Sequence, residues 1–326
     1  MWQCPGCGSP EAHVELTLTS VEAADYFVRA WSEPKIHSQL VECIGSIWDS
    51  EEARIVNCAS CGLRSSDPFV SGTGEFFSLV YGQRDSVQPY PAWRWEFQWT
   101  RSLVQSTSGT VFDVGAGDGA FQRCLIDAGI APSRLYASEY NSDARQALVE
   151  LGVNATGADL TELPPASHSV VCGHQVIQHL ANLDGVFRAF DALTSPDGLV
   201  ALAVSNGIHK ARQAAAGGLM DMPPNHISTW QYSSFKAAAA LRGWQLVDFK
   251  EQSVSRVGSA KALSISQTHR ARQNPNSLTA MIDNLHVSPR ARYRLMAMSA
   301  ASRLPLNLIT KREPCGGSIW ALFSRA

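Results

Sequence analysis

The feature that most constrains the fold of this chain is a glycine-rich turn directly after a short apolar run. The sequence reads TVFDVGAGDGAF, in which Val111 to Val114 form the predicted strand and Gly115, Gly117 and Gly119 the turn. Glycines in such a turn let the backbone approach a ligand closely and leave the next helix open toward it at its N-terminus. The stretch therefore predicts a strand, a ligand-binding turn and a helix, a pattern that dinucleotide-binding domains share.

The residues that follow alternate between strands and helices, which is typical of a parallel sheet covered on both faces. A second strand in SRLYASEYN ends at Glu139, an acid well placed to accept hydrogen bonds from both ribose hydroxyls of an adenosine. A third strand in NATGADLTELP has Asp159 and Leu160 at its exit. Four more strands are predicted in HSVVCGHQVIQHL, GLVALAVSN, WQLVDFKEQ and the C-terminal GSIWALFSRA. The sequence thus predicts a seven-stranded, doubly wound (Rossmann-like) α/β sheet.

The order of these motifs resembles class I S-adenosylmethionine-dependent methyltransferases. It is similar in particular to a branch with an N-terminal zinc-binding module, which includes sugar methyltransferases acting on nucleotide-linked deoxysugars. The motifs that carry the resemblance are DVGAGDG, the later acid, VIQHL and PPNH. The resemblance implies that Asp113 and Gly115 hold the methionine end of the cofactor and Glu139 the ribose. It assigns the adenine to Asp159 and Leu160.

The same resemblance assigns Gly117 and Gly119 to the cofactor loop. Tyrosines near Tyr81 and Tyr90 reach the cofactor or the acceptor in similar enzymes, so Tyr90 is a further cofactor-binding candidate. Gln178 is a departure, because the family more often has an acid at this position, and we therefore give it no catalytic role.

Two other functions share part of this pattern. A nicotinamide-dependent dehydrogenase also uses a glycine turn and a ribose-binding acid, but it typically shows GxGxxG, whereas the glycines here alternate. A methyltransferase-like fold could instead serve as a non-catalytic, zinc-dependent scaffold. The intact glycine turn and Glu139 argue against the scaffold.

Two CxxC pairs about fifty residues apart predict a metal site near the N-terminus. Cys4 and Cys7 lie in CPGCG, and Cys58 and Cys61 in CASCG. Four thiolates suit tetrahedral Zn²⁺ with no open position, which is a structural site. Two unrelated pairs or a redox CxxC are the alternatives. Between the pairs, VEAADYFVRAW is expected to form an amphipathic helix.

Composition supports this interpretation of the cysteines. The chain has 326 residues, is 45% hydrophobic and 17% charged, and reads as a globular protein of two domains. It contains no apolar stretch near twenty residues and no secretory signal, so we expect no membrane span and a cytoplasmic location. In a reducing cytosol, paired cysteines more often bind metal than form disulfides.

Methyl transfer to oxygen or carbon requires a base, because the acceptor must lose a proton. Histidine is the natural candidate, since it titrates near neutral pH. His226 lies in the proline-stiffened loop MPPNHIST after the fifth strand, and it is the first candidate. His174, at the exit of the fourth strand, is the second candidate. For His179, on the following helix, packing or capping is the favoured role.

Charge is concentrated near the C-terminus. From Lys250 onward the sequence has 12 Lys and Arg against three acids, in a chain whose total charge is −2. SPRARYRLM places Arg290, Arg292 and Arg294 in one helix-like run, a candidate receptor for an anion. A solvated basic face is the alternative. We therefore expect a small, phosphorylated acceptor, most simply a sugar nucleotide or a phosphate-linked glycan precursor.

An RNA methyltransferase is the alternative for this charge. The segment from Cys4 to Cys61 is rich in acids and poor in Lys and Arg, which would repel a phosphate backbone, so no nucleic acid partner is expected. Three units result: a zinc-binding module over 1–80, a catalytic domain over 81–250 with 313–326, and a basic helical insertion over 251–312. The insertion is expected to cover the active site or to form a contact in a homo-oligomer.

Overall fold

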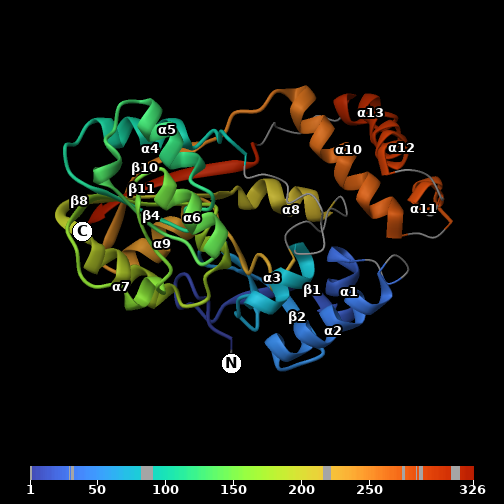
Figure 1. The fold of residues 1–326 in the computed structure, drawn as a ribbon. Coiled ribbons are helices and arrows are strands. Elements are labelled where there is room, and N and C mark those ends of the chain that lie inside the picture. The colour runs from blue at the N-terminus through green and yellow to red at the C-terminus, as the bar shows by residue number, and fades with distance from the viewer. Residues whose placement is uncertain are drawn as a thin grey trace.

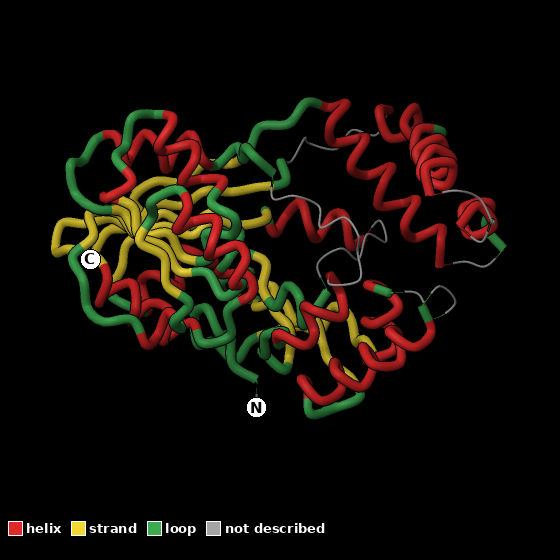
Figure 2. Tube along the Cα trace, viewed as in Figure 1, coloured by secondary structure: helices red, strands yellow, loops and turns green. Residues whose placement is uncertain are grey.

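Two sheets organise the protein. The structure, a computed structural model, describes residues 2–28, 30, 33–81, 91–215, 222–273, 276–283, 285, 289–309 and 316–326. A seven-stranded sheet lies at the centre of one lobe, and a four-stranded sheet near the N-terminus lies beside it (Figures 1 and 2). A group of C-terminal helices lies apart from both sheets (Figure 1).

The large sheet has the strand order β10-β11-β8-β7-β4-β5-β6. The bounds are β4 (Val111–Val114), β5 (Leu135–Ser138), β6 (Asn154–Thr156), β7 (His168–His174), β8 (Thr194–Ser205), β10 (Trp244–Glu251) and β11 (Ser318–Arg325). β11 pairs antiparallel with both β8 and β10, and the other pairs are parallel. The predicted seven-stranded, Rossmann-like sheet is confirmed, including its last strand from the end of the printed sequence.

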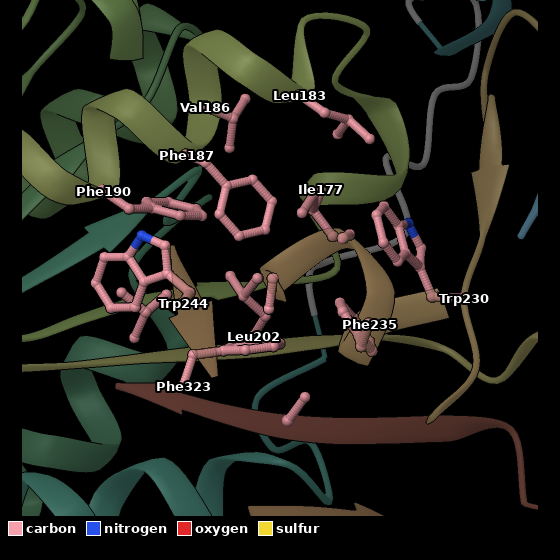
Figure 3. Close-up of a cluster of buried hydrophobic side chains, with 14 of the residues drawn as sticks. Ile177, Leu183, Val186, Phe187, Phe190, Leu202, Trp230, Phe235, Trp244 and Phe323 are labelled. Atoms are coloured by element: carbon pink, nitrogen blue, oxygen red, sulfur yellow. The ribbon is translucent and has the colours of Figure 1, made fainter. Parts of the chain in front are cut away.

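Helices pack on both faces of this sheet, which explains the continuous apolar runs within its central strands β7 and β8. On one face, Phe112 and Leu202 pack with α7 (Leu183–Leu193) and α9 (Tyr232–Leu241), as Figure 3 shows in part. On the other face, strand residues such as Val111, Ala137 and Ala201 pack with three helices. These are α4 (Phe97–Gln105), α5 (Ala120–Asp127) and α6 (Ser142–Glu150).

The topology fixes where a ligand can bind. From β4 the chain runs outward through β5 and β6, and then returns to the other side of β4 as β7 and β8. Such a reversal opens a crevice at the carboxyl ends of the strands, where doubly wound proteins bind their ligands. Three short 3-10 helices lie near these strands: η1 (Pro132–Arg134), η2 (Leu160–Glu162) and η3 (Ile177–His179).

The N-terminal module contains more structure than the one predicted helix. Its sheet has the order β1-β2-β3-β9, with β1 (Ala12–Thr19), β2 (Glu52–Cys58), β3 (Arg64–Asp67) and β9 (Ser228–Thr229). Its helices are α1 (Ser20–Phe27), α2 (Pro34–Trp48) and α3 (Gly74–Tyr81). The predicted helix corresponds to α1, which a Thr19–Glu22 capping box starts. The longer α2 buries more residues than either of the other two helices of the module.

The fourth strand of that sheet comes from the segment predicted to be catalytic. β9 pairs with β3 through Arg64 with Thr229 and Ser65 with Ser228. The N–H of Ser66 donates to the carbonyl of Ile227, and the N–H of Gly72 to that of Pro224, both at 2.9 Å. The loop 222–230, which carries His226, is therefore bonded to the N-terminal module along much of its length.

The late insertion is helical, as predicted. It forms a helical lobe of α10 (Arg256–Gln273), α11 (Leu278–Asp283), α12 (Pro289–Ala301) and α13 (Leu304–Ile309). Its main contact with the rest of the described chain joins α10 to α8 (Gly207–Ala215), which follows β8 (Figure 1). α10 is 18 residues long, yet no helix in the described ranges is both long and apolar enough to cross a bilayer.

Candidate active site and metal centre

The glycine turn after β4 has the geometry that only glycine adopts readily. Gly115, Gly117 and Gly119 have φ values of 66°, 58° and 86°. A Cβ on Gly115 would lie 2.7 Å from Cγ2 of Val176, and one on Gly119 would lie 2.9 Å from a methyl of Leu151. The positive φ values and these short contacts both exclude larger side chains at Gly115 and Gly119. The backbone of the turn therefore stays open at the carboxyl edge of β4.

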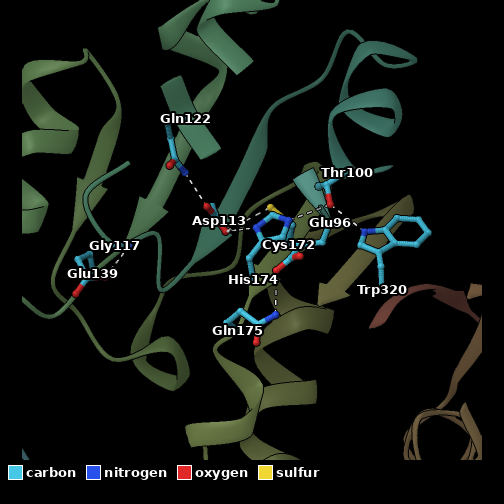
Figure 4. A network of polar contacts seen from close by, with 10 residues as sticks. All are labelled: Glu96, Thr100, Asp113, Gly117, Gln122, Glu139, Cys172, His174, Gln175 and Trp320. Carbon is cyan, nitrogen blue, oxygen red and sulfur yellow. Dashed lines mark hydrogen bonds and ion pairs between the residues drawn. The ribbon is translucent and has the colours of Figure 1, made fainter. Parts of the chain in front are cut away.

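Glu139 lies over this turn. It follows β5, and its Oε2 accepts a hydrogen bond from the N–H of Gly117 at 2.8 Å (Figure 4). Its Oε1 accepts from the N–H of Asn141 at 2.9 Å. The structure thus brings the predicted ribose acid and the predicted cofactor loop together, 22 residues apart in the sequence.

Asp159 and Leu160 lie at the exit of β6, and sequence reasoning missed their neighbour. Leu160 is buried, whereas Tyr140, the residue after Glu139, is largely exposed and donates its hydroxyl to Asp159 at 2.7 Å. Hydrogen bonds from Thr161 lower the pKa of Asp159. Burial, with Asp159 nearby, raises the pKa of Tyr140 to about 12. The position directly after the ribose acid was the signal that could have identified Tyr140.

Asp113 and His174 belong to one buried network beside the turn (Figure 4). Trp320 donates its indole N–H to Oγ1 of Thr100 at 2.9 Å, and that hydroxyl lies 3.0 Å from Nε2 of His174. Since Thr100 accepts from the indole, its own proton is free for Nε2. Nδ1 of His174 faces Asp113 at 3.7 Å. Gln122 also donates to Asp113, at 2.8 Å.

This network holds His174 inside the protein. The His174 side chain is 6% exposed, and its ring packs against Phe97 and Phe121. Cys172 donates its thiol to Asp113 at 3.5 Å, and burial raises the pKa of that thiol well above its ordinary value. Although Asp113, Cys172 and His174 lie close enough to share a metal ion, the protonated thiol acts here as a hydrogen-bond donor.

His226 lies in a second network, at the ends of β7 and β8. Oε1 of Gln178 accepts from the N–H of Ser205 at 3.1 Å, which fixes the orientation of its carboxamide. The amide nitrogen of Gln178 therefore faces Nε2 of His226, at 3.2 Å. His179 contacts His226 ring to ring at 4.5 Å and lies 2.6 Å, through Nδ1, from the carbonyl of Asn225. Gln178 thus contacts the predicted base directly.

Glu96 and Gln175 are a pair that the sequence gave no reason to select. Glu96 precedes α4 and is 1% exposed. Nε2 of Gln175 donates to Oε1 of Glu96 at 2.9 Å (Figure 4). Gln175 has a φ of 61°, in the left-handed region that non-glycine residues rarely adopt. Strain of this kind is often found at functional sites.

The four predicted metal ligands form one cluster. Their sulfur atoms all lie within 4.8 Å of one another, with Cys4 to Cys61 and Cys7 to Cys58 each at 3.6 Å. The hydrogen bond between Cys4 and Cys61 lowers the pKa of Cys4 to about 5 and raises the pKa of Cys61. Cys4, Cys58 and Cys61 are buried in the same apolar cluster as Trp230, from the loop 222–230, and Phe235 of α9.

The predicted anion receptor lies on α12. Helix periodicity places positions 290 and 294 on one face of α12 and position 292 on the opposite one. Arg294 is exposed, and the side chains of Arg290 and Arg292 lie outside the described part of the structure, as does Tyr90. Position 81 ends α3.

Comparison with solved structures finds many chains of related architecture. One is coclaurine N-methyltransferase bound to N-methylheliamine and SAH, at 14% identity, TM-score 0.42 and 70% coverage of each chain. Another is an O-methyltransferase from a Brevibacillus brevis polyketide synthase with S-adenosyl-L-homocysteine, at 15% identity, TM-score 0.43 and coverage of 70% of this chain and 72% of that one. The cyclase SpnF is a third, at 14% identity, TM-score 0.42 and coverage of 70% and 80%.

No curated protein sequence matches the chain. Residues 94–248 match a family model described as a methyltransferase domain, and this range contains the glycine turn, Glu139, Asp159 and the loop with His226. The matched residues form six of the seven strands of the large sheet, in the order that the motifs predicted. Residues 94–248 of this chain thus match a methyltransferase domain.

Proposed function

We propose that the cofactor binds across the glycine turn, in contact with Asp113, Gly115, Gly117, Gly119, Glu139, Asp159 and Leu160. The turn leaves room for a close backbone contact, because a Cβ at Gly115 or Gly119 would collide with neighbouring side chains. The Glu139 carboxylate lies over the same turn, where it can accept hydrogen bonds from a ribose. Leu160 and Tyr140 offer an apolar and an aromatic surface to an adenine. When bound, S-adenosylmethionine supplies a methyl group on an activated sulfonium.

We propose His226 as the base that removes the acceptor's proton. The observation that supports this role is the orientation of Gln178, whose amide N–H points at Nε2 of His226. A nitrogen that accepts a hydrogen bond carries the lone pair that a base requires. An acceptor hydroxyl that replaces the Gln178 N–H at Nε2 would hand its proton to the same nitrogen. His174 remains the second candidate, although its ring nitrogens face Thr100 and Asp113.

The acceptor we propose is a small phosphorylated molecule, methylated on oxygen or carbon, and a sugar nucleotide is the simplest example. The supporting observation is the positive charge that begins at Lys250, with 12 Lys and Arg against three acids. Most of these residues lie in the helical lobe, which contacts α8 directly beyond the end of β8. A basic surface near the carboxyl edge of the sheet favours a phosphate over a neutral acceptor.

We propose that Cys4, Cys7, Cys58 and Cys61 hold one structural zinc ion. Tetrahedral Zn²⁺ with Zn–S bonds of ~2.3 Å requires sulfur atoms about 3.8 Å apart, close to the two 3.6 Å separations. Four sulfur ligands leave no open position, so the ion would support the fold and not the reaction.

Mass spectrometry of reactions with S-adenosylmethionine tests the proposed acceptor. The protein is incubated with a panel of nucleotide sugars and, in parallel, with short RNAs. We expect a mass gain of one CH₂ unit on a nucleotide sugar and none on the RNAs. Methylated RNA without any methylated sugar nucleotide would contradict the proposed acceptor and leave the methyltransferase assignment standing.

A further inference from the structure

Glu96 is a buried carboxylate without a cation. Its side chain is 1% exposed, and its hydrogen-bond donor is the neutral carboxamide of Gln175, at 2.9 Å. Among the described residues, no lysine, arginine or histidine forms an ion pair with Glu96. A buried charge paired with one neutral amide lowers stability, because the amide replaces only part of the hydration lost on burial.

Hydrogen bonds of Gln175 hold the Glu96 carboxylate in a fixed orientation. Gln175, its donor, has the left-handed φ of 61°, and its backbone N–H donates to the carbonyl of Ala203 at 2.6 Å. Oε1 of the same carboxamide lies 3.4 Å from Nε2 of Gln178 and 3.4 Å from Oγ of Ser205. The amide nitrogen of Gln175 is therefore directed at Glu96, and both side chains point toward one another in Figure 4.

The pair adjoins the cofactor turn. The residue after Gln175 is Val176, whose Cγ2 lies where a Cβ on Gly115 would come within 2.7 Å. Asp113, at the base of the turn, is a second buried acid, and His174 is its cationic partner only when protonated. Two buried carboxylates therefore flank the start of the glycine turn, and among the described residues neither is paired with a lysine or an arginine.

We propose that Glu96 is the counter-ion of a positive charge on the bound cofactor. S-adenosylmethionine is the cationic ligand of this enzyme class, with positive charges on its sulfonium and its α-ammonium. Either charge would balance the Glu96 carboxylate and strengthen binding of the methyl donor. If the partner is the sulfonium, Glu96 would bind the product S-adenosylhomocysteine less tightly, because the product lacks this charge. The inference rests on the proposed cofactor site, and Glu96 has no role in it so far.

A structural role makes the opposite prediction. Glu96 stands at the N-cap of the nine-residue α4, where a negative charge is favourable to the helix dipole. If that is its purpose, neutralising the residue lowers the stability of the ligand-free protein. If Glu96 awaits a cation, neutralising it relieves an unbalanced buried charge and raises that stability, as is common for groups kept for function.

The test is calorimetric titration and thermal unfolding of Glu96→Gln, which keeps the shape and the acceptor oxygen for Gln175. We expect the affinity for S-adenosylmethionine to fall about 10- to 100-fold, the scale of hydrogen bonds to charged groups. The unfolding temperature of the ligand-free variant should be unchanged or higher. Titration with S-adenosylhomocysteine distinguishes the two charges. If the affinity of Glu96→Gln for this product is unchanged, the partner of Glu96 is the sulfonium. If this affinity falls as much as that for S-adenosylmethionine, the partner is the α-ammonium.

Glu150→Gln is the matched control, because Glu150 is exposed and accepts the same kind of bond from Gln146, at 3.4 Å. It should change neither affinity nor stability. Unchanged affinity of Glu96→Gln for both ligands overturns the inference, as does an affinity loss with a lower ligand-free unfolding temperature. Glu139→Ala separates this failure from a misplaced cofactor site, since it weakens binding whenever the proposed site is correct.

Discussion

The N-terminal module and the helical lobe are joined to the catalytic sheet in contrasting ways. The module shares an apolar cluster with the sheet's helical layer and receives β9 as its fourth strand. Arg242 donates to the carbonyls of Pro5 and Gly6 at 2.9 Å, and Ser233 to that of Cys61 at 2.8 Å. Both CxxC turns are thus bonded to α9 and to the residue that follows it.

The helical lobe has polar residues in its interior and large apolar side chains on its surface. Its interior contains hydrogen-bonded polar residues, with Asn307 donating to Ser264 at 2.8 Å. Its surface carries large apolar side chains, among them Leu278, Met298 and Leu306, which are 72%, 67% and 68% exposed. Its main contact with the described body of the protein is the packing of α10 on α8. We infer that the module is an integral part of the active-site architecture and that the lobe is an attachment to it.

Loss of one metal ligand should have the largest effect. In Cys58→Ser we expect zinc to fall well below one equivalent per chain. Unfolding of the N-terminal module should cost at least about 3 kcal/mol less, a fraction of the ~10–16 kcal/mol that zinc supplies to small modules. Metal analysis and thermal unfolding measure both changes. Cys43→Ser, a buried cysteine of α2 outside the cluster, should retain the metal, and a full equivalent of zinc in Cys58→Ser would refute the proposed site.

The variant His226→Ala tests the proposed base in the loop 222–230, which is bonded to the N-terminal module. We expect kcat to fall about 10²–10⁴-fold, the range for a general base, with affinity for S-adenosylmethionine nearly unchanged. The acid limb of the pH–rate profile should disappear in the variant. These quantities are measured by steady-state kinetics on the acceptor found by mass spectrometry, with the exposed His13→Ala as control. Near-full turnover would exclude His226 and make His174 the next residue to test.

Substitutions in the lobe should have the smallest effect. Replacing Arg290 and Arg294 together should raise KM for a phosphorylated acceptor about 2- to 30-fold, since exposed ion pairs contribute ~0.2–1 kcal/mol each. The value of kcat should be retained, because such contacts bind ground and transition states alike. Arg292→Ala, on the opposite helix face, is the control. A fall in kcat as large as that of His226→Ala would show that the lobe belongs to the catalytic machinery.

The sequence predicted the large sheet because each of its strands carries a local signal. Most of its strands contain short apolar runs bounded by turns, and the glycine turn and Glu139 directly follow two of them. The small sheet carries weaker signals. β1 alternates apolar and polar residues in AHVELTLT, which indicates a strand, but β9 is two residues long and pairs across more than 150 positions. No local pattern predicts such a pairing.

The same holds for the candidate site, where local motifs mark some residues and not others. Glu139 and Gly117 could be paired from their motifs, and the four cysteines from their spacing. The Glu96–Gln175 pair joins residues 79 positions apart with no motif around either. Gln178 stands where the resemblance suggested an acid, and its contact with His226 depends on how the loop 222–230 is held by β3. Long-range packing decides these contacts, so they require the structure.

Hydrogen-exchange mass spectrometry on the wild type and Cys58→Ser tests the central claim most directly. If the module is integral to the active site, loss of the metal ligand should speed exchange in β2, in β3 and in the described residues 222–230. Exchange in α10–α13 should stay as in the wild type, because the lobe shares no sheet or apolar cluster with the module in the described residues. Unchanged protection of residues 222–230 despite a disordered module, or equal loss of protection in the lobe, would contradict the account.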